Sequence, residues 1–125
     1  MEREFSVKLE NRPGELARMT EALSKEGVNI RAISTEPHAG LIRMVASDET
    51  KCRQCLQRMS IEFSERNLLV ARVEDRPGEL ARISSMLSKE GVNIDGAYLL
   101  DKDSGIAQIA LAVSDEDKAK NTLKL

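Results

Sequence analysis

Apolar and polar residues alternate in two short segments of the chain, each followed by an apolar pattern of helical period. Phe5–Glu10 and Leu69–Glu74 keep apolar residues at every second position, which is typical of a strand with one buried face. Downstream of each segment, apolar residues recur every three or four positions, which places them on one face of a predicted helix. The positions on that face are Leu16, Met19, Thr20 and Leu23 in the first segment and Leu80, Ile83 and Leu87 in the second.

A Pro-Gly turn joins each predicted strand to its helix. The turns read Asn-Arg-Pro-Gly at 11–14 and Asp-Arg-Pro-Gly at 75–78. Proline suits the first helical position, because its missing N–H is not needed there. Gly27 and Gly91 are placed to end the two helices as left-handed caps, and the valine after each glycine would make the hydrophobic contact that accompanies such caps.

Two more strands and a second helix are predicted after each of these helices. Strands are expected near 29–36 and 93–100, with hairpin turns at 37–40 and 101–105 leading to strands at 41–47 and 106–113. Ser-Asp pairs at 47–48 and 114–115 have the chemistry of helix N-caps. A short strand near 61–64 completes the first set of elements. The chain ends at Leu125 directly after the last helix, so the second set lacks its final strand.

The two sets are copies of one sequence unit, offset by 64 residues. From Glu10 to Ile30, 16 of 21 positions are identical to those from Glu74 to Ile94. Such self-similarity marks an internal repeat. We therefore expect a first module at residues 1–66 and a C-terminally truncated second module at 67–125, with little more than Arg66-Asn67 between them.

Composition narrows the functional class. Hydrophobic residues make up 41% and charged residues 32% of the chain, as in folded globular proteins. A net charge of −2, interspersed signs and only 2% aromatic residues argue against nucleic-acid binding. No apolar run approaches a membrane span, and the charged N-terminus is unlike a signal peptide. We expect a cytoplasmic location and no nucleic-acid or membrane partner.

Candidate catalytic and metal-binding residues are few. Cys52 and Cys55 have the C-x-x-C spacing of redox or zinc sites. They fall inside a helical pattern, and His38 on a hairpin turn is the only further ligand of the usual zinc type. We interpret both cysteines as ordinary helix residues. The sequence therefore predicts no catalytic residue, no metal and no cofactor.

The repeated turn has the chemistry of a binding site for a small zwitterion. Unpaired amides at a helix start attract a carboxylate, and glycine lets a ligand approach the backbone closely. The residue that opens each turn can accept hydrogen bonds from an ammonium group, and an asparagine early in each second strand both donates and accepts. A purely structural turn remains the alternative, since it explains the proline and the glycine equally well. The residues in question are Asn11, Gly14 and Asn29, and Asp75, Gly78 and Asn93.

These motifs resemble the ACT domain, here in tandem. The resemblance rests on the strand, the [Asn/Asp]-Arg-Pro-Gly-x-Leu turn, the helix and Gly-Val-Asn-Ile, and it covers nearly the whole chain. It implies regulatory βαββαβ modules that bind amino acids where paired modules meet, with contacts from the turn of one module and the asparagine of its partner. With the turn arginines included, the candidate ligand-binding set is Asn11, Arg12, Gly14, Asn29, Asp75, Arg76, Gly78 and Asn93.

Pattern and resemblance together predict an α+β chain of two ferredoxin-like βαββαβ modules with antiparallel sheets, packed side by side. The nearly continuous apolar runs at 97–100 and 106–113 predict strands buried on both faces. The expected function is non-catalytic: a homodimer that binds an amino acid and modulates a separate metabolic enzyme or regulator. A ligand-free interaction module or regulatory subunit is the alternative.

The copies differ in charge near the predicted site. Asp75 replaces Asn11, and Asp95 replaces Arg31. A carboxylate favours a ligand ammonium and disfavours a nearby carboxylate. We therefore expect two sites of unequal affinity, or a single active site.

Overall fold

The computed structural model describes residues 2–125, which form two compact units. Contacts group Arg3–Arg66 into the first unit and Asn67–Leu125, together with Glu2, into the second. Among the described residues, no helix combines the length and the apolar character that crossing a bilayer requires.

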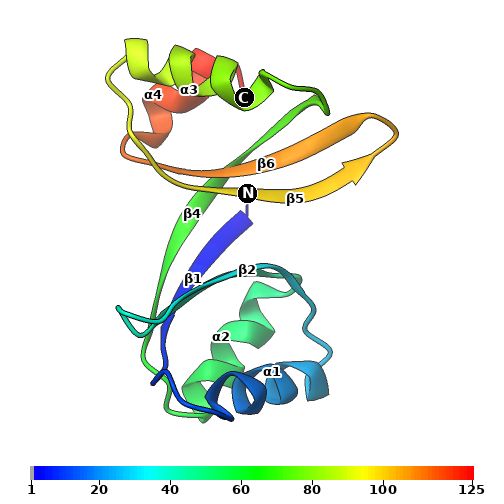
Figure 1. Cartoon of the computed structure of the whole chain (residues 1–125), viewed down its shortest axis with the longest axis vertical. Helices are drawn as coiled ribbons and strands as arrows, with labels where there is room; N and C mark the ends of the chain where they lie inside the picture. The colour runs from blue at the N-terminus through cyan, green and yellow to red at the C-terminus, as the bar shows by residue number, and fades with distance from the viewer. Residues whose placement is uncertain (1) are drawn as a thin grey trace. The chain divides into compact units, whose positions relative to one another are not determined.

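The first module has the element order βαββαβ. Its strands lie in the order β2-β3-β1-β4, and both β1 and β2 are antiparallel to β3. Figure 1 shows α1 and α2 on the same side of this sheet. The elements are β1 (Glu2–Lys8), α1 (Glu15–Lys25), β2 (Ile30–Glu36), β3 (Leu41–Ala46), α2 (Glu49–Arg58) and the start of β4 (Phe63–Glu74).

The second module repeats this arrangement as far as its second helix. Its strand order is β4-β6-β5 with antiparallel pairing, and α3 and α4 lie on one side of the sheet (Figure 1). Within residues 2–125 no strand follows α4, as the sequence predicts. Its elements after β4 are α3 (Glu79–Lys89), β5 (Ile94–Asp103), β6 (Ile106–Val113) and α4 (Glu116–Leu123).

Strand β4 departs from the sequence prediction. Arg66 and Asn67, expected to connect the modules, lie in the interior of this 12-residue strand. The physical reason is that apolar residues from Leu68 onward carry the strand pattern across the boundary without a turn residue.

Each module buries its own apolar core between the sheet and its two helices. In the first module Cys52 and Cys55 belong to this core, which confirms their interpretation as helix residues. Burial raises the pKa of the Cys52 thiol to about 12, because the thiolate is poorly solvated there. Both cores are mainly aliphatic, and the first also buries Phe5. Met19, Leu23, Met44 and Leu56 are central in the first core, and Ile83, Leu87 and Leu111 in the second.

The helices α1 and α3 end in the caps predicted from the sequence. Gly27 and Gly91 have φ angles of +76° and +72°. Gly27 N–H donates to the Ser24 carbonyl at 2.9 Å, and Val28 N–H donates to the Leu23 carbonyl at 3.0 Å. This pair of bonds is the Schellman motif, and it recurs after α3. It directs each chain from helix back into the sheet.

Two local predictions are wrong. Pro13 lies two residues before the first helical residue, because Gly14 is left-handed and the helix begins only after it. The apolar run at 97–100 also does not make β5 buried on both faces: Ala97 and Leu99 are exposed. β5 is the outer strand of its sheet, so fewer neighbours cover it. In β6, by contrast, every residue from Ile109 to Val113 is buried.

The caps can be tested by substitution. Gly91→Ala places a Cβ in left-handed backbone although no heavy atom lies within 4 Å of that Cβ position. The change should therefore lower the free energy of unfolding by backbone strain alone, by about 1–2 kcal/mol. Urea unfolding measures this, with Lys89→Ala in right-handed backbone as the control. Equal stability of the two variants would contradict the capping role.

Candidate functional site

The turns before α1 and α3 have the same unusual backbone. Gly14 and Gly78 are the N-cap residues, with φ angles of +91° and +94°. A Cβ at either glycine would meet nothing within 4 Å, so the left-handed conformation, and not lack of space, requires glycine here. The space beside each glycine is open to a ligand.

Both helix starts lack a side-chain cap. The helices α2 and α4 differ, because Asp48 and Asp115 accept hydrogen bonds from Lys51 N–H and Lys118 N–H at 3.0 Å. In α1 Glu15 N–H donates to the Arg12 carbonyl at 3.3 Å. The amides of Leu16 and Ala17, and those of the first turn of α3, thus keep their partial positive charge available to an anion.

Ion pairs within the turn account for its repeated arginines and glutamates. Arg12 contacts Glu10 at 2.9 Å and Glu15 at 3.1 Å, and Arg18 reaches Glu15 at 3.5 Å. In the second module the corresponding glutamate, Glu79, is buried and lies 3.0 Å from Arg76 and 2.8 Å from Arg82. These contacts brace the turn against the first helical turn.

The network changes the acidity of its central carboxyls. A hydrogen bond from Arg12 lowers the pKa of Glu15 below its ordinary value of 4.5, with partial burial acting against it. Glu79 shows the same lowering of its pKa, caused first by the hydrogen bond from Arg82 and then by that from Arg76. Both carboxylates therefore stay ionised in the fold to a lower pH than in the unfolded chain.

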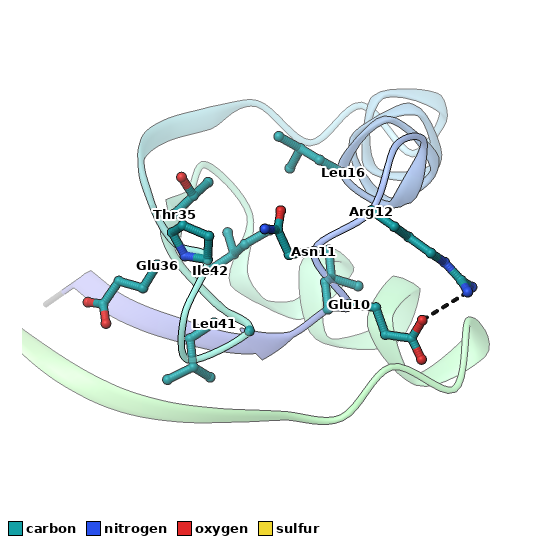
Figure 2. Close-up of a pocket in the computed structure, with 11 residues that line it drawn as sticks. Glu10, Asn11, Arg12, Leu16, Thr35, Glu36, Leu41 and Ile42 are labelled. Atoms are coloured by element: carbon teal, nitrogen blue, oxygen red, sulfur yellow. Dashed lines mark ion pairs between the residues drawn. The ribbon is translucent and has the colours of Figure 1, made fainter.

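A pocket of about 240 Å³ lies beside the first turn, between α1 and the strands β2 and β3. Figure 2 shows Asn11 projecting into the space between Leu16 and Thr35, whereas Arg12 extends away from it toward Glu10. The remaining wall comes from β2, β3 and the hairpin, including Glu36, Pro37, Leu41 and Ile42.

The second module has a pocket of about 380 Å³ at the corresponding place. Asp75 takes the position of Asn11, and Leu80 takes that of Leu16. Tyr98 and Lys102 of β5 line it as well, and Lys102 Nζ lies 3.5 Å from Asp75 Oδ1. The pair partly offsets the negative charge that the sequence comparison assigns to this copy.

Asn29 and Asn93 line neither of these pockets. Because β1 and β2 both run antiparallel to β3, the end of β1 and the start of β2 lie at opposite ends of the sheet. One module therefore does not bring Asn29 and Asn11 together. The backbone of Asn29 is bound to Ser47, with its N–H donating to Ser47 Oγ at 2.9 Å and its carbonyl accepting from Ser47 N–H at 2.8 Å.

Asn93 makes one hydrogen bond more than those described for Asn29. Its backbone pairs with Ser114 as that of Asn29 pairs with Ser47. In addition, Asn93 Nδ2 donates to Asp95 Oδ1 at 2.6 Å. The aspartate that replaces Arg31 thus takes up part of the hydrogen-bonding capacity of Asn93.

Several pocket residues were not among the candidates from the sequence. Leu16 and Leu80 were expected on the buried helix face, yet they are 40% and 47% exposed and form pocket walls. Their place one turn before the buried Met19 and Ile83, directly after the turn, is the feature that could have identified them. The positions of Tyr98 and Lys102 at the pocket depend on the register of β5, and the local sequence pattern does not specify that register.

No metal site is evident in the described part of the chain, where no three His, Cys, Asp or Glu side chains are grouped to hold an ion. His38 lies exposed in the turn between β2 and β3. The arrangement at the two turns offers hydrogen bonds, a helix dipole and apolar walls, which suits binding of a small ligand.

The fold defines a class, a tandem pair of ferredoxin-like βαββα(β) modules, and the comparisons define the family. The chain belongs to the ACT domain family, whose model matches residues 3–51 and 67–124. ACT domains are regulatory domains. The search of the curated proteins found no match.

Solved structures are similar over nearly the whole chain. A protein of Bacteroides thetaiotaomicron is 30% identical, with a TM-score of 0.88 over 98% of this chain and 85% of that one. The ligand-free regulatory subunit of aspartate kinase from Thermus thermophilus is 16% identical, with a TM-score of 0.67 over 98% and 88% of the two chains. Aspartate kinase of Clostridium acetobutylicum is 18% identical, with a TM-score of 0.62 over 98% and 32%. The last two likenesses concern the fold alone.

The turn network predicts a pH dependence of stability. The pKa values of Glu15 and Glu79 are lower in the fold than in the unfolded chain, so their contribution is complete above the ordinary value of 4.5 and is lost as pH falls through their folded pKa values. A variant with Glu15→Gln and Glu79→Gln should lose less unfolding free energy than the wild type between about pH 6 and pH 3.

Urea unfolding at a series of pH values measures this difference. Glu21→Gln, on the exposed face of α1, is the matched control and should follow the wild type. Some slope should persist in the double variant, because hydrogen bonds from Arg53 and Arg3 also lower the pKa of Glu65. Identical slopes for wild type and double variant would refute the role of the network.

Proposed function

We propose that this protein binds an amino acid at its Pro-Gly turns and thereby regulates a separate enzyme or regulator. The ligand carboxylate is received by the uncapped first-turn amides of α1, and its ammonium group is accepted by Asn11. Leu16 and the β2–β3 hairpin surround the side chain. In the second module Asp75 and Leu80 line the corresponding pocket, and Gly78 is the corresponding N-cap residue.

One observation carries the proposal: a pocket occurs at the same turn in both modules, next to a helix start that has no side-chain cap. The pocket volumes, about 240 and 380 Å³, lie near the small end of the range for ligand sites. Such a volume suits a metabolite of amino-acid size. The role of Arg12 and Arg76 in this proposal is to brace the turn through Glu15 and Glu79.

In this proposal, Asn29 and Asn93 each contact a ligand that is bound at the turn of another module. Because neither lies at the pocket of its own module, a ligand at a turn meets such an asparagine only on another module. In a homodimer, a module of the partner chain would supply this asparagine and the two chains would share the ligand. A ligand that favours one arrangement of paired modules would change the activity of a bound partner, with typical couplings of about 1–3 kcal/mol.

The likeness to the regulatory subunit of aspartate kinase supports a regulatory function of this kind, although that likeness concerns the fold.

The first-module turn is proposed as the tighter amino-acid site. Asp75 is paired with Lys102, and Asn93 is hydrogen-bonded to Asp95. A ligand at these groups must first displace an internal partner. Within residues 2–125, Asn11 carries no corresponding ion pair.

Calorimetry tests the proposal after a thermal-shift screen of the twenty amino acids has selected a ligand. Asn11→Ala should weaken its binding roughly threefold to tenfold, because one or two hydrogen bonds are lost. Asn121→Ala, an exposed asparagine on α4, is the matched control and should bind as the wild type does. No melting-temperature shift with any amino acid at millimolar concentration would contradict the proposal.

The same titrations test the inequality of the two sites. The wild type should show two classes of site, and Asn11→Ala should weaken the tighter class. Two identical sites would contradict the asymmetry derived from Asp75 and Asn93.

A ligand-free interaction module is the second candidate function. It is favoured by large apolar side chains that remain exposed, namely Leu16, Leu80 and Leu99 at the pockets and Ile33 on β2. Such side chains are common at protein interfaces. A dimer by sedimentation that no amino acid stabilises would favour this second function over the first.

A further inference from the structure

The hairpin beside the second pocket is longer than its counterpart beside the first. In the first module the last pair of the ladder is Glu36 with Leu41, and a turn follows at once. In the second module the ladder continues until Asp103 pairs with Ile106. Lys102 lies in this extension and has no equivalent in the first module.

A β-bulge determines the face on which Lys102 lies. The β5–β6 register shifts between Leu99 and Asp101, so Leu100 is an extra residue on β5. Leu99 pairs with Ile109, and after the bulge Lys102 pairs with Ala107. Ile109 and Ala107 both belong to the core under the helices.

In a regular strand, residues three positions apart face opposite sides of the sheet. The extra residue therefore returns Lys102 to the face of Leu99, which is the face with the pocket and Asp75. The bulge thus has a visible consequence: Lys102 Nζ is held 3.5 Å from Asp75 Oδ1.

The pair places an internal ammonium group where a bound amino acid would place its own. Asp75 stands at the position of Asn11, the proposed acceptor of the ligand ammonium. The other charges lining the pocket are already matched, since Arg76 lies 2.6 Å from Glu74 and 3.0 Å from Glu79, and Arg82 also contacts Glu79. Lys102 in turn offsets the carboxylate that would otherwise repel a ligand carboxylate.

We propose that Lys102 is the specificity-determining residue of the second pocket and selects carboxylic acids that lack the α-ammonium group, such as 2-oxo acids with apolar side chains. The apolar part of such a ligand would contact Leu80, Ala97 and Leu99. This inference rests on the proposed function, because it assigns a second ligand class to the equivalent of the amino-acid site. The protein then responds to an amino acid at one turn and to its deaminated relative at the other.

The chain contains its own reporter for this pocket. Tyr98 belongs to the pocket strand β5 and is the only tyrosine of a sequence that has no tryptophan. It stands between Ala97 and Leu99 on that strand, so its fluorescence reports on β5 of the second module, while calorimetry records binding at both pockets.

The experiment titrates the full chain with matched pairs, leucine and phenylalanine against the 2-oxo acid of each, and follows Tyr98 fluorescence. The wild type should bind each 2-oxo acid more tightly than its amino acid. Lys102→Met should shift that preference toward the amino acid by roughly twofold to fivefold for each ligand, the range expected of a partly exposed ion pair. Lys102→Gln should behave in the same way, and Lys118→Met on α4 is the matched control that should change nothing.

Three results would overturn the inference: tighter binding of the amino acids by the wild type, an unchanged preference in both Lys102 variants, or no Tyr98 response to any of the four ligands. Failure of the proposed function is separate, because it is read from calorimetry of the first site and its dependence on Asn11. If amino acids bind there while Tyr98 shows no selectivity, only the role of Lys102 is lost.

Discussion

The left-handed backbone at Gly14 and Gly78 is the constraint on which both proposed sites depend. With φ near +90°, each glycine reverses the chain after its strand and makes the helix begin one residue later, without a side-chain cap. The same geometry separates the side chains of the turn, so that Asn11 points into the pocket while Arg12 points toward Glu10 (Figure 2). A residue with a Cβ would resist this conformation, and the exposed amides would then lose their position.

The ion pairs around the turn stabilise it, and some of their residues also line the pockets: Glu10 and Arg12 in the first module, and Glu74, Arg76 and Glu79 in the second. Glu15 and Glu79 each receive two arginines, one from the turn and one from the next helical turn. Arginine in a turn next to an uncapped helix start suggests direct ligand contact, and the structure shows a further role for Arg12 and Arg76 in ion pairs. Their partners are glutamates of the same module, which explains why arginine and glutamate occur together in both copies.

The two modules keep the turn and differ in the hairpin that faces it. The identical block ends at Ile30 and Ile94, and the hairpins beyond it diverge in length and register. One extra residue at Leu100 is sufficient to change the face of every residue that follows it on β5. The proposed difference in ligand preference thus requires no change in the turn itself beyond Asn11 to Asp75.

Much of the fold could be predicted from the sequence, because it depends on local patterns. The alternation in β1, the Gly27 and Gly91 caps and the Asp48 and Asp115 N-caps are all encoded within a few residues. The continuous strand across Arg66 and Asn67 was missed, since polar residues in a strand resemble a linker. The candidate site was predicted in part. The turn residues follow from the motif, whereas the residues that they contact cannot be inferred from it.

The missed features depend on register and on distant segments. Lys102 reaches Asp75 only because of a bulge, and no residue type in the sequence predicts that bulge. Leu16 is exposed because β2 is an outer strand. The separation of Asn29 from Asn11 follows from strand direction, which becomes apparent only when the sheet is assembled.

The central claim is that uncapped amides at the two Pro-Gly turns receive the ligand. Its most direct test is an amide NMR titration of the nitrogen-15-labelled chain with the amino acid that gives the largest thermal shift. The account predicts that the amide resonances of residues 14–17 and 78–81 move with saturation, those of the first turn before those of the second. The first turns of α2 and α4, capped by Asp48 and Asp115, serve as internal controls and should stay in place. Resonance changes confined to other segments, or equal changes at the capped and uncapped helix starts, would contradict it.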